Sequence, residues 1–168
     1  MVESLRPETG ACRLSDNDDL DALYREEAPR LWRALTAYAG DGDVAQDAVS
    51  EAFAQAITRG DEIRSVKRWV WKAAYRIAAG ELKRRRTLVE MGAAGPVVPD
   101  FSDEPAGEVR TALSELSEMQ RAAIVLHYYA GYPARDIARI TGSTPAAVWV
   151  HLSRGRRAMR RMLEGDDD

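Results

Sequence analysis

The side chains with the most evident chemistry are five arginines between residues 143 and 163, a stretch without acidic residues. Guanidinium groups pair with phosphate oxygens and can bind guanine through two hydrogen bonds at once. The stretch follows an apolar helical pattern at 133–140 and the turn Thr141-Gly142-Ser143. A short helix, a tight turn and a longer basic helix form the helix-turn-helix pattern, whose second helix enters the major groove of DNA.

Helical spacing divides this basic helix into two faces. Val148, Leu152 and Met159 are expected to face the core. Arg154 is the best candidate for a contact to guanine. A helical hairpin that only has a basic surface is the alternative for this segment taken alone. The predicted base readers are Trp149, Val150, Ser153, Arg154 and Arg157, and the predicted phosphate contacts are Arg156, Arg160 and Arg161.

A second basic segment, residues 65–86, holds eight basic side chains and one acidic one. Trp71 and Tyr75 lie one helical turn apart in it, beside cations, and aromatic rings among cations suit unpaired DNA bases. Core packing is an equal alternative for both rings, and Trp69 is expected in the core. The expected apolar stripe is Val66, Trp69, Val70, Ala73 and Ile77. The predicted strand-binding residues are Lys67, Trp71, Lys72, Tyr75, Arg76 and Lys83.

The region before this basic helix is acidic. Residues 15–64 carry 12 acidic and 5 basic side chains, although the whole chain has a net charge of only −3. The helix around Asp47 to Phe53 is acidic and partly apolar, so it could dock on the helices of a partner protein. A solvated amphipathic helix explains the same pattern equally well.

The elements that must position these residues are all predicted to be helical, because strand-like alternation is absent from the sequence. The prediction is an all-α protein of two small helical domains, with three helices and then four, joined by a flexible acidic linker. Pro29 predicts a kink or a break in the first helix. The expected segments are a flexible arm at 1–15, a first domain at 16–86, the linker at 87–107, a second domain at 108–163 and an acidic tail at 164–168.

Turn residues set the expected helix ends. Gly40 to Asp43 forms a turn and a helix cap, and Gly60 ends the second helix. Ser117 and Gln120 fit a capping box, in which each side chain satisfies the other's backbone N–H group. Thr144 and Pro145 are expected to cap and start the last helix.

The composition disfavours several other classes of protein. A single cysteine, Cys12, cannot form an internal disulfide or a zinc site, and His127 and His151 lie far apart in the sequence. We find no catalytic triad, phosphate loop or carboxylate pair, and so expect no enzyme, cofactor or metal. The apolar runs are shorter than the ~20 residues that cross a membrane, and the start of the chain does not fit a secretion signal. A cytoplasmic protein is expected.

Together these segments resemble the extracytoplasmic-function (group four) sigma factors over residues 18–86 and 108–163. Their order and spacing carry the resemblance. The chain departs from the family's usual residues at Arg76, Gly80, Trp149 and His151. The matching stretches are Asp47 to Phe53, Trp69 to Ala74, Leu82 to Arg86, Ala112 to Arg121, Asp136 to Ala138 and Ala147 to Arg156.

The resemblance implies how such a chain works. The first domain would dock on the coiled coil of the largest subunit of RNA polymerase core and capture the unpaired minus-ten strand. The second would contact the polymerase flap and read the minus-thirty-five duplex. An anti-sigma factor would regulate the chain. Because the acidic block at 15–64 repels DNA, the binding of DNA without core is also expected to be weak. The docking residues implied are Asp47, Ser50, Glu51 and Phe53.

Three further readings are kept. The linker carries Glu90, Asp100, Asp103 and Glu104 and no basic residue, so it could occupy a basic channel that is built for RNA. The chain could instead be a sigma-like mimic that sequesters an anti-sigma factor without starting transcription. It could also be an ordinary regulator that uses only the second domain's helix-turn-helix.

Overall fold

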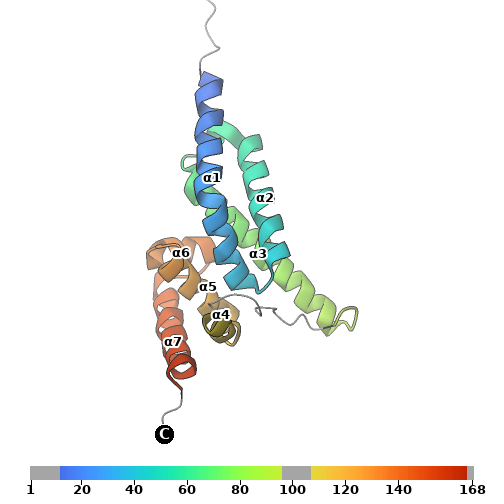
Figure 1. The fold of residues 1–168 in the computed structure, drawn as a ribbon, viewed down its shortest axis with the longest axis vertical. Coiled ribbons are helices and arrows are strands. Elements are labelled where there is room, and N and C mark those ends of the chain that lie inside the picture. Colours follow the sequence, from blue (N-terminus) through green and yellow to red (C-terminus); the bar gives the residue numbers. More distant parts are fainter. Residues whose placement is uncertain (1–11, 96–106, 166–168) are drawn as a thin grey trace, which may run out of the picture.

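The computed structural model describes residues 12–95 and 107–165, and within these ranges every regular element is helical, which confirms the predicted class (Figure 1). The elements are α1 (Cys12–Ala39), α2 (Gly42–Arg59), a 3₁₀ turn η1 (Gly60–Glu62), α3 (Val66–Glu90), α4 (Gly107–Ser114), α5 (Glu118–Ile124), a π-helical turn η2 (Val125–Tyr129), α6 (Ala134–Thr141) and α7 (Pro145–Glu164).

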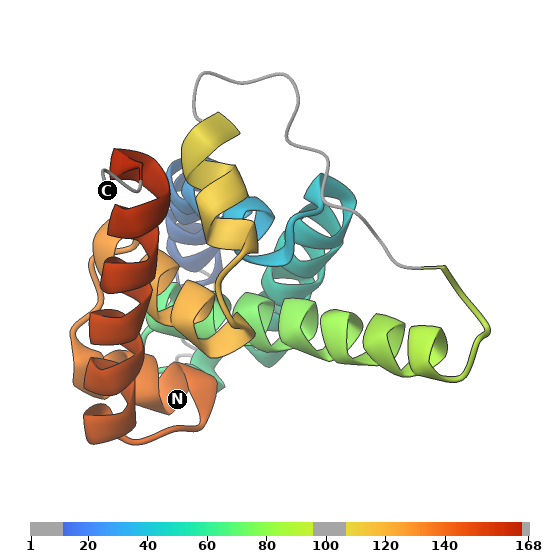
Figure 2. The same cartoon turned by 90° about the horizontal axis from the view of Figure 1, so that it is seen from below.

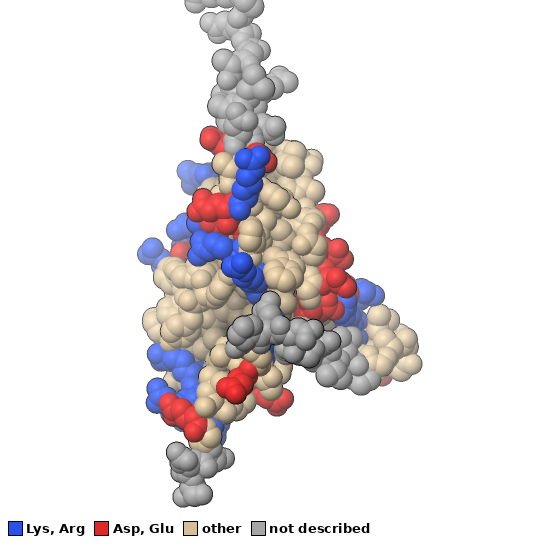
Figure 3. All heavy atoms as spheres, viewed as in Figure 1, with Lys and Arg blue, Asp and Glu red and all other residues tan. Residues whose placement is uncertain are grey.

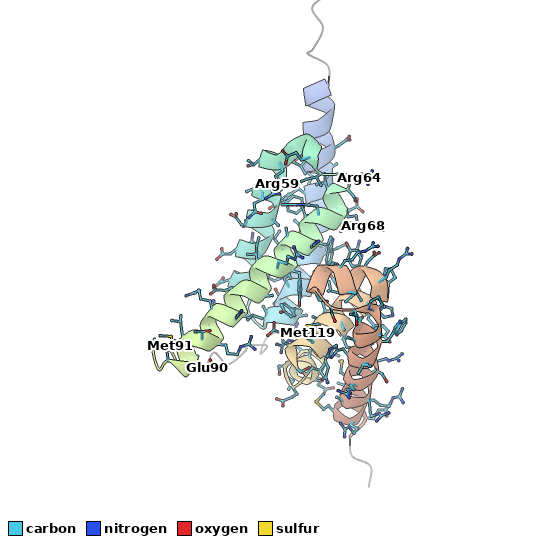
Figure 4. The ribbon with its side chains drawn as sticks, turned by 180° about the vertical axis from the view of Figure 1, so that it is seen from behind. Arg59, Arg64, Arg68, Glu90, Met91 and Met119 are labelled. Carbon is cyan, nitrogen blue, oxygen red and sulfur yellow. The ribbon has the colours of Figure 1, made fainter. Side chains whose placement is uncertain are left out.

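Helices α1, α2 and α3, here called the N-terminal block, form a three-helix unit in which α3 crosses behind the other two (Figures 1 and 4). Asp41 caps α2, because its side chain accepts hydrogen bonds from the backbone N–H groups of Asp43 and Val44. Gly60 ends α2 with a φ of +48°, a value that favours glycine. The expected turn and helix end are thus confirmed.

Helix α1 differs from the expectation at two points. It begins at Cys12, inside the segment 1–15 that was expected to be a flexible arm, so residues 12–15 are helical. It also continues through Pro29 without a break. Residues 1–11 of the expected arm lie outside the described part of the chain.

Helices α4 to α7, here called the C-terminal block, follow the predicted order. The capping box at Ser117 and Gln120 is present. Gly142 ends α6 in the left-handed region, and Thr144 caps α7 by accepting a hydrogen bond from the N–H group of Ala147. Pro145 occupies the first turn of α7, where its missing N–H group costs nothing.

The buried face of α3 is displaced from the predicted one. Val70 is buried as expected, but Trp69 is only half-buried while Trp71 is 2% exposed. The reason is tertiary: α3 packs against α1 and α2 and also against α6, so a second side of the helix is covered. The buried residues of α3 are Val70, Trp71, Ala74, Tyr75 and Ala78.

The two blocks contact each other directly. The apolar part of this contact joins Tyr38, Trp71 and Tyr75 to Ala122, Val125 and Leu126. The far end of α3 projects away from the C-terminal block, as Figure 2 shows. The two blocks therefore share one buried core rather than merely lying at the two ends of a linker.

Parts of the predicted linker and tail lie beyond the described residues. Of the four linker acids, Glu90 closes α3, whereas Asp100, Asp103 and Glu104 fall in the segment 96–106 that is not described. The same holds for residues 166–168 of the acidic tail. None of the described helices is long and apolar enough to span a membrane.

Candidate nucleic-acid interface

Helix α7 presents the predicted reading face to solvent. Val148 and Leu152 are buried and Met159 is half-buried, so the opposite face is turned outward. In Figure 3 basic side chains lie along the outer edge of α7, with acidic ones near the end of that helix, and acidic side chains gather along the edge formed by α2. All eight predicted contact residues of this helix are exposed: Trp149, Val150, Ser153, Arg154, Arg156, Arg157, Arg160 and Arg161.

Two features of the C-terminal block hold α7 in place. The cap at Thr144 and the left-handed Gly142 fix where α7 starts after α6. Farther along, Gly155 is buried against α5, where an added Cβ atom would lie 3.0 Å from Cγ1 of Ile124. The predicted base-reading face is thus carried by a helix that is packed on its inner side.

The structure corrects the prediction for two aromatic residues of α3. Trp71 and Tyr75 were predicted to stack on unpaired bases, but both are buried between the two blocks. The indole N–H group of Trp71 donates to Oε2 of Glu27 at 2.9 Å, and its ring meets Tyr132 edge-on at 5.7 Å. Tyr75 packs against Tyr38 with 4.9 Å between ring centroids. In this arrangement neither ring can accept a base.

Glu27 organises the inner side of α3. Its side chain is fully buried, and Nζ of Lys67 lies 2.6 Å from its Oε1. Burial by itself would raise the pKa of Glu27, but hydrogen bonds from Lys67 and Trp71 outweigh burial and hold that pKa below its usual value. Lys67, although partly exposed, is therefore engaged by a carboxylate rather than free for a phosphate.

The outer side of α3 carries the aromatic and basic surface that the inner side lacks. Trp69 is half-buried there, and the guanidinium of Arg59 lies 5.6 Å from its ring centroid, a cation–π distance. Lys72 is half-buried and Arg76 exposed. We call this surface the outer groove; it has a volume of about 290 Å³ and is lined by Gln55, Arg59, Trp69, Lys72, Ala73, Arg76 and Ile77.

Sequence reasoning missed Trp69 and Arg59 as candidates. A signal was present: Trp69, Lys72 and Arg76 follow each other at spacings of three and four residues, which places them on one helix face. Figure 4 shows Arg59, Arg64 and Arg68 around the first turns of α3, while Glu90 and Met91 mark its other end. The cationic start of α3 thus lies next to the outer groove.

The last turns of α3 are basic but partly neutralised. Arg85 donates to Asp41, the N-cap residue of α2, at 2.7 Å and to Glu81 at 2.9 Å, whereas Lys83 is exposed. Hydrogen bonds from Arg84 and Arg85 lower the pKa of Glu81 to about 2. Of the basic residues at this end, Lys83 is thus better placed than Arg85 to meet a phosphate.

The predicted docking face on α2 divides into exposed and buried residues. Asp47, Ser50 and Glu51 are exposed along one side of the helix. Phe53 is buried and packs edge-on against Tyr24 with 4.8 Å between ring centroids. The structure corrects the prediction for Phe53, whose ring stabilises the contact between α1 and α2 instead of touching a partner.

Several known proteins are similar to this chain over most of its length. Residues 106–159 match the family described as sigma-70, region 4. The extracytoplasmic-function RNA polymerase sigma factor SigC of Mycobacterium tuberculosis is 27% identical, over 88% of this chain and 85% of that protein. The RNA polymerase sigma factor SigV of Bacillus subtilis is 25% identical, over 82% of this chain and 86% of that protein.

Two solved structures share the fold. The sigma factor RpoE of Bartonella quintana, solved with the anti-sigma factor NepR, superposes with a TM-score of 0.74 at 21% identity, covering 88% of this chain and 98% of that one. CnrH, solved with the cytosolic domain of CnrY, gives 0.66 at 19% identity, covering 90% and 91%. The region-4 match and the relatives thus show that this chain is similar to extracytoplasmic-function RNA polymerase sigma factors, and the two solved structures show that it shares their fold.

Proposed function

We propose that this chain binds RNA polymerase core and directs it to promoters, reading the minus-thirty-five duplex with α7 and the unpaired minus-ten strand with the outer groove of α3. The observation that carries this proposal is the exposed face of α7, whose arginines point away from a well-packed inner side. A slim basic helix after a tight turn fits the major groove. The chain acts by binding, with no catalytic step of its own.

The outer groove supports the second half of the proposal. A base that leaves the duplex needs an aromatic face to stack on and cations for its phosphates. Trp69 offers the ring, and Arg59, Lys72 and Arg76 offer the charge. This surface stays accessible while the inner rings of Trp71 and Tyr75 are covered by the C-terminal block.

The exposed acidic side of α2 is the proposed docking surface for the largest-subunit coiled coil of core, through Asp47, Ser50 and Glu51. The C-terminal block would meet the polymerase flap. Regulation by an anti-sigma factor is proposed because two structures of the same fold were solved with partners, one of them named as an anti-sigma factor. With its net charge of −3, the chain is expected to bind promoter DNA weakly until core holds it there.

The test is transcription with purified core polymerase on a pool of genomic promoter fragments. We expect transcripts that depend on both the chain and core and whose promoters share two sequence elements. Arg154→Ala should lower transcription from them about 5-fold or more, because a bidentate base contact is worth about 1–3 kcal/mol. Leu163→Ala, at an exposed apolar position at the far end of α7, is the control and should leave transcription unchanged.

A second variant tests the outer groove. Trp69→Ala should slow open-complex formation on duplex promoters, and a template that is already unpaired at the minus-ten element should restore much of the rate. If transcription depends on the chain at none of the promoters, the result would instead favour a mimic that sequesters an anti-sigma factor. Tight, specific promoter binding by the chain without core would favour a stand-alone regulator.

A further inference from the structure

The π-helical turn η2 interrupts the C-terminal block beside α7. In it the N–H group of Ala130 donates to the carbonyl of Val125 at 3.1 Å, so the turn holds one residue more than an α-helical turn. Such turns displace the following side chains and occur often at functional sites. Here Val125 is buried, whereas His127 is half-buried and Tyr128 is exposed next to α7.

His127 contacts Trp149, an aromatic residue of the predicted reading face of α7. The centroid of the His127 ring lies 6.1 Å from that of the Trp149 indole and 4.9 Å from that of the Tyr128 ring, and both contacts are edge-on. The Nδ1 atom of His127 lies 2.9 Å from the carbonyl oxygen of Tyr132. A carbonyl oxygen only accepts, so Nδ1 carries the hydrogen, and this bond fixes the plane of the ring.

Tyr128 holds a second residue of the same face. Nη1 of Arg156 donates to the hydroxyl of Tyr128 at 3.2 Å. Trp149 and Arg156 are seven residues apart, which is two helical turns, so they lie on one side of α7. The π-helical turn therefore supports the reading face at two points, although it lies outside the helix-turn-helix itself.

Trp149 is 53% exposed and Val150 beside it is 44% exposed, so an apolar patch lies in the middle of a basic surface. In the major groove the prominent apolar group on a base edge is the 5-methyl group of thymine. We propose that Trp149 recognises that methyl group in the minus-thirty-five duplex, and that His127 and Tyr128 are positioning residues for Trp149 and Arg156. This inference rests on the proposed function, in which α7 lies in the major groove.

The test replaces thymine by deoxyuracil, one position at a time, in the minus-thirty-five element of a promoter that the chain transcribes with core. This change removes only the methyl group. Holoenzyme affinity should fall about 4-fold at one position or two adjacent positions, which is the value of one buried methyl group. Trp149→Ala should bind the thymine and deoxyuracil duplexes equally well, whereas the Leu163→Ala control should keep the 4-fold difference.

Each other outcome overturns the inference. Three results would exclude the methyl contact. The unchanged holoenzyme could bind both duplexes with equal affinity, the element could contain no thymine, or the difference in affinity could persist in Trp149→Ala. Loss of transcription in Trp149→Ala without any thymine preference in the unchanged chain would assign the patch to a protein contact instead. The proposed function is tested separately, because core-dependent transcription does not require a preference for thymine over deoxyuracil.

The positioning roles of His127 and Tyr128 can be distinguished from a general loss of fold, because the two residues should affect different properties of DNA binding. His127→Ala should reduce the ratio of thymine to deoxyuracil affinity, because the indole loses its support. Tyr128→Phe and Arg156→Ala should instead weaken binding to both duplexes equally. They should also lower the slope of log affinity against log salt concentration, by about one for Arg156→Ala. The double variant, with Tyr128→Phe and Arg156→Ala together, should bind DNA no more weakly than Arg156→Ala alone. An unchanged thymine ratio in His127→Ala would exclude its positioning role.

Discussion

Gly155 is a residue at which α7 lies close to α5. It is buried, and an added Cβ atom would meet Cγ1 and Cδ1 of Ile124 at 3.0 and 3.3 Å. A glycine in the middle of a helix costs about 1 kcal/mol relative to alanine. That cost is offset here by the close approach of two helices, which keeps the opposite face of α7 turned to solvent.

Gly155→Leu is expected to lower the free energy of unfolding by about 1–3 kcal/mol, the usual cost of overpacking a well-packed core. Urea unfolding measures this change. The matched control is Gly80→Leu, because Gly80 is helical and exposed and has open space around it. The control should leave stability unchanged or raise it by up to about 1 kcal/mol. Equal losses at both positions would contradict the packing argument.

At the scale of elements, Arg85 connects α3 to the start of α2. It donates to Asp41, which also caps α2, and to Glu81 one turn earlier in α3. Burial by itself would raise the pKa of Asp41, but hydrogen bonds from Arg85 and from the N–H groups of Val44 and Asp43 outweigh it, and that pKa is lowered. Both carboxylates therefore favour the folded state when they are ionised.

This clamp predicts how stability depends on pH. The pKa of Glu81 falls from an ordinary value of 4.5 to about 2 on folding, so its contribution is complete above about pH 5 and is lost as the pH falls toward 2. Glu81→Gln should show a smaller loss of unfolding free energy over that range than the unchanged chain, in urea unfolding at a series of pH values. Identical slopes would contradict this account. Glu108→Gln, in the first turn of α4, is the control.

At the scale of the whole molecule, the contact between the blocks has a polar rim around an apolar centre. The hydroxyl of Tyr38 donates to Oε1 of Glu118 at 2.9 Å, and Arg86 donates to the other oxygen of that carboxylate at 3.2 Å. Arg68 pairs with Asp136 at 3.6 Å on the other side of the contact. The two proposed reading surfaces lie outside this contact, on the outer side of α3 and on α7.

Tyr38→Phe is expected to destabilise both blocks together. The variant removes one hydrogen bond to a charged acceptor, and the expected loss is about 1–2 kcal/mol because Glu118 keeps Arg86 and some contact with water. Hydrogen exchange followed by mass spectrometry should show faster exchange in both α1 and α5. Faster exchange in α1 alone would mean that the blocks are not energetically coupled. Tyr129→Phe, at an exposed ring, is the control.

Local sequence patterns were enough to predict that the chain is helical, where α5 and α7 begin, and which face of α7 is exposed. Local chemistry sets these features: Ser117 with Gln120, Gly142 and Thr144 with Pro145 fix helix ends through hydrogen bonds between near neighbours. The faces of α7 followed from a single period of 3.6 residues, because α7 is covered on one side only. Its eight predicted contact residues are therefore all exposed.

Which aromatic rings of α3 are accessible depends on packing between segments that are distant in the sequence. A helix that is covered on two sides by segments distant in the sequence has no single apolar stripe, so its periodicity could not tell Trp69 from Trp71. The buried partner of Trp71 is Glu27, 44 residues away, and the ring that covers it belongs to Tyr132. Phe53 is likewise part of the core, where its ring packs against that of Tyr24. Long-range packing thus moved the aromatic candidate for strand binding from the inner to the outer side of α3.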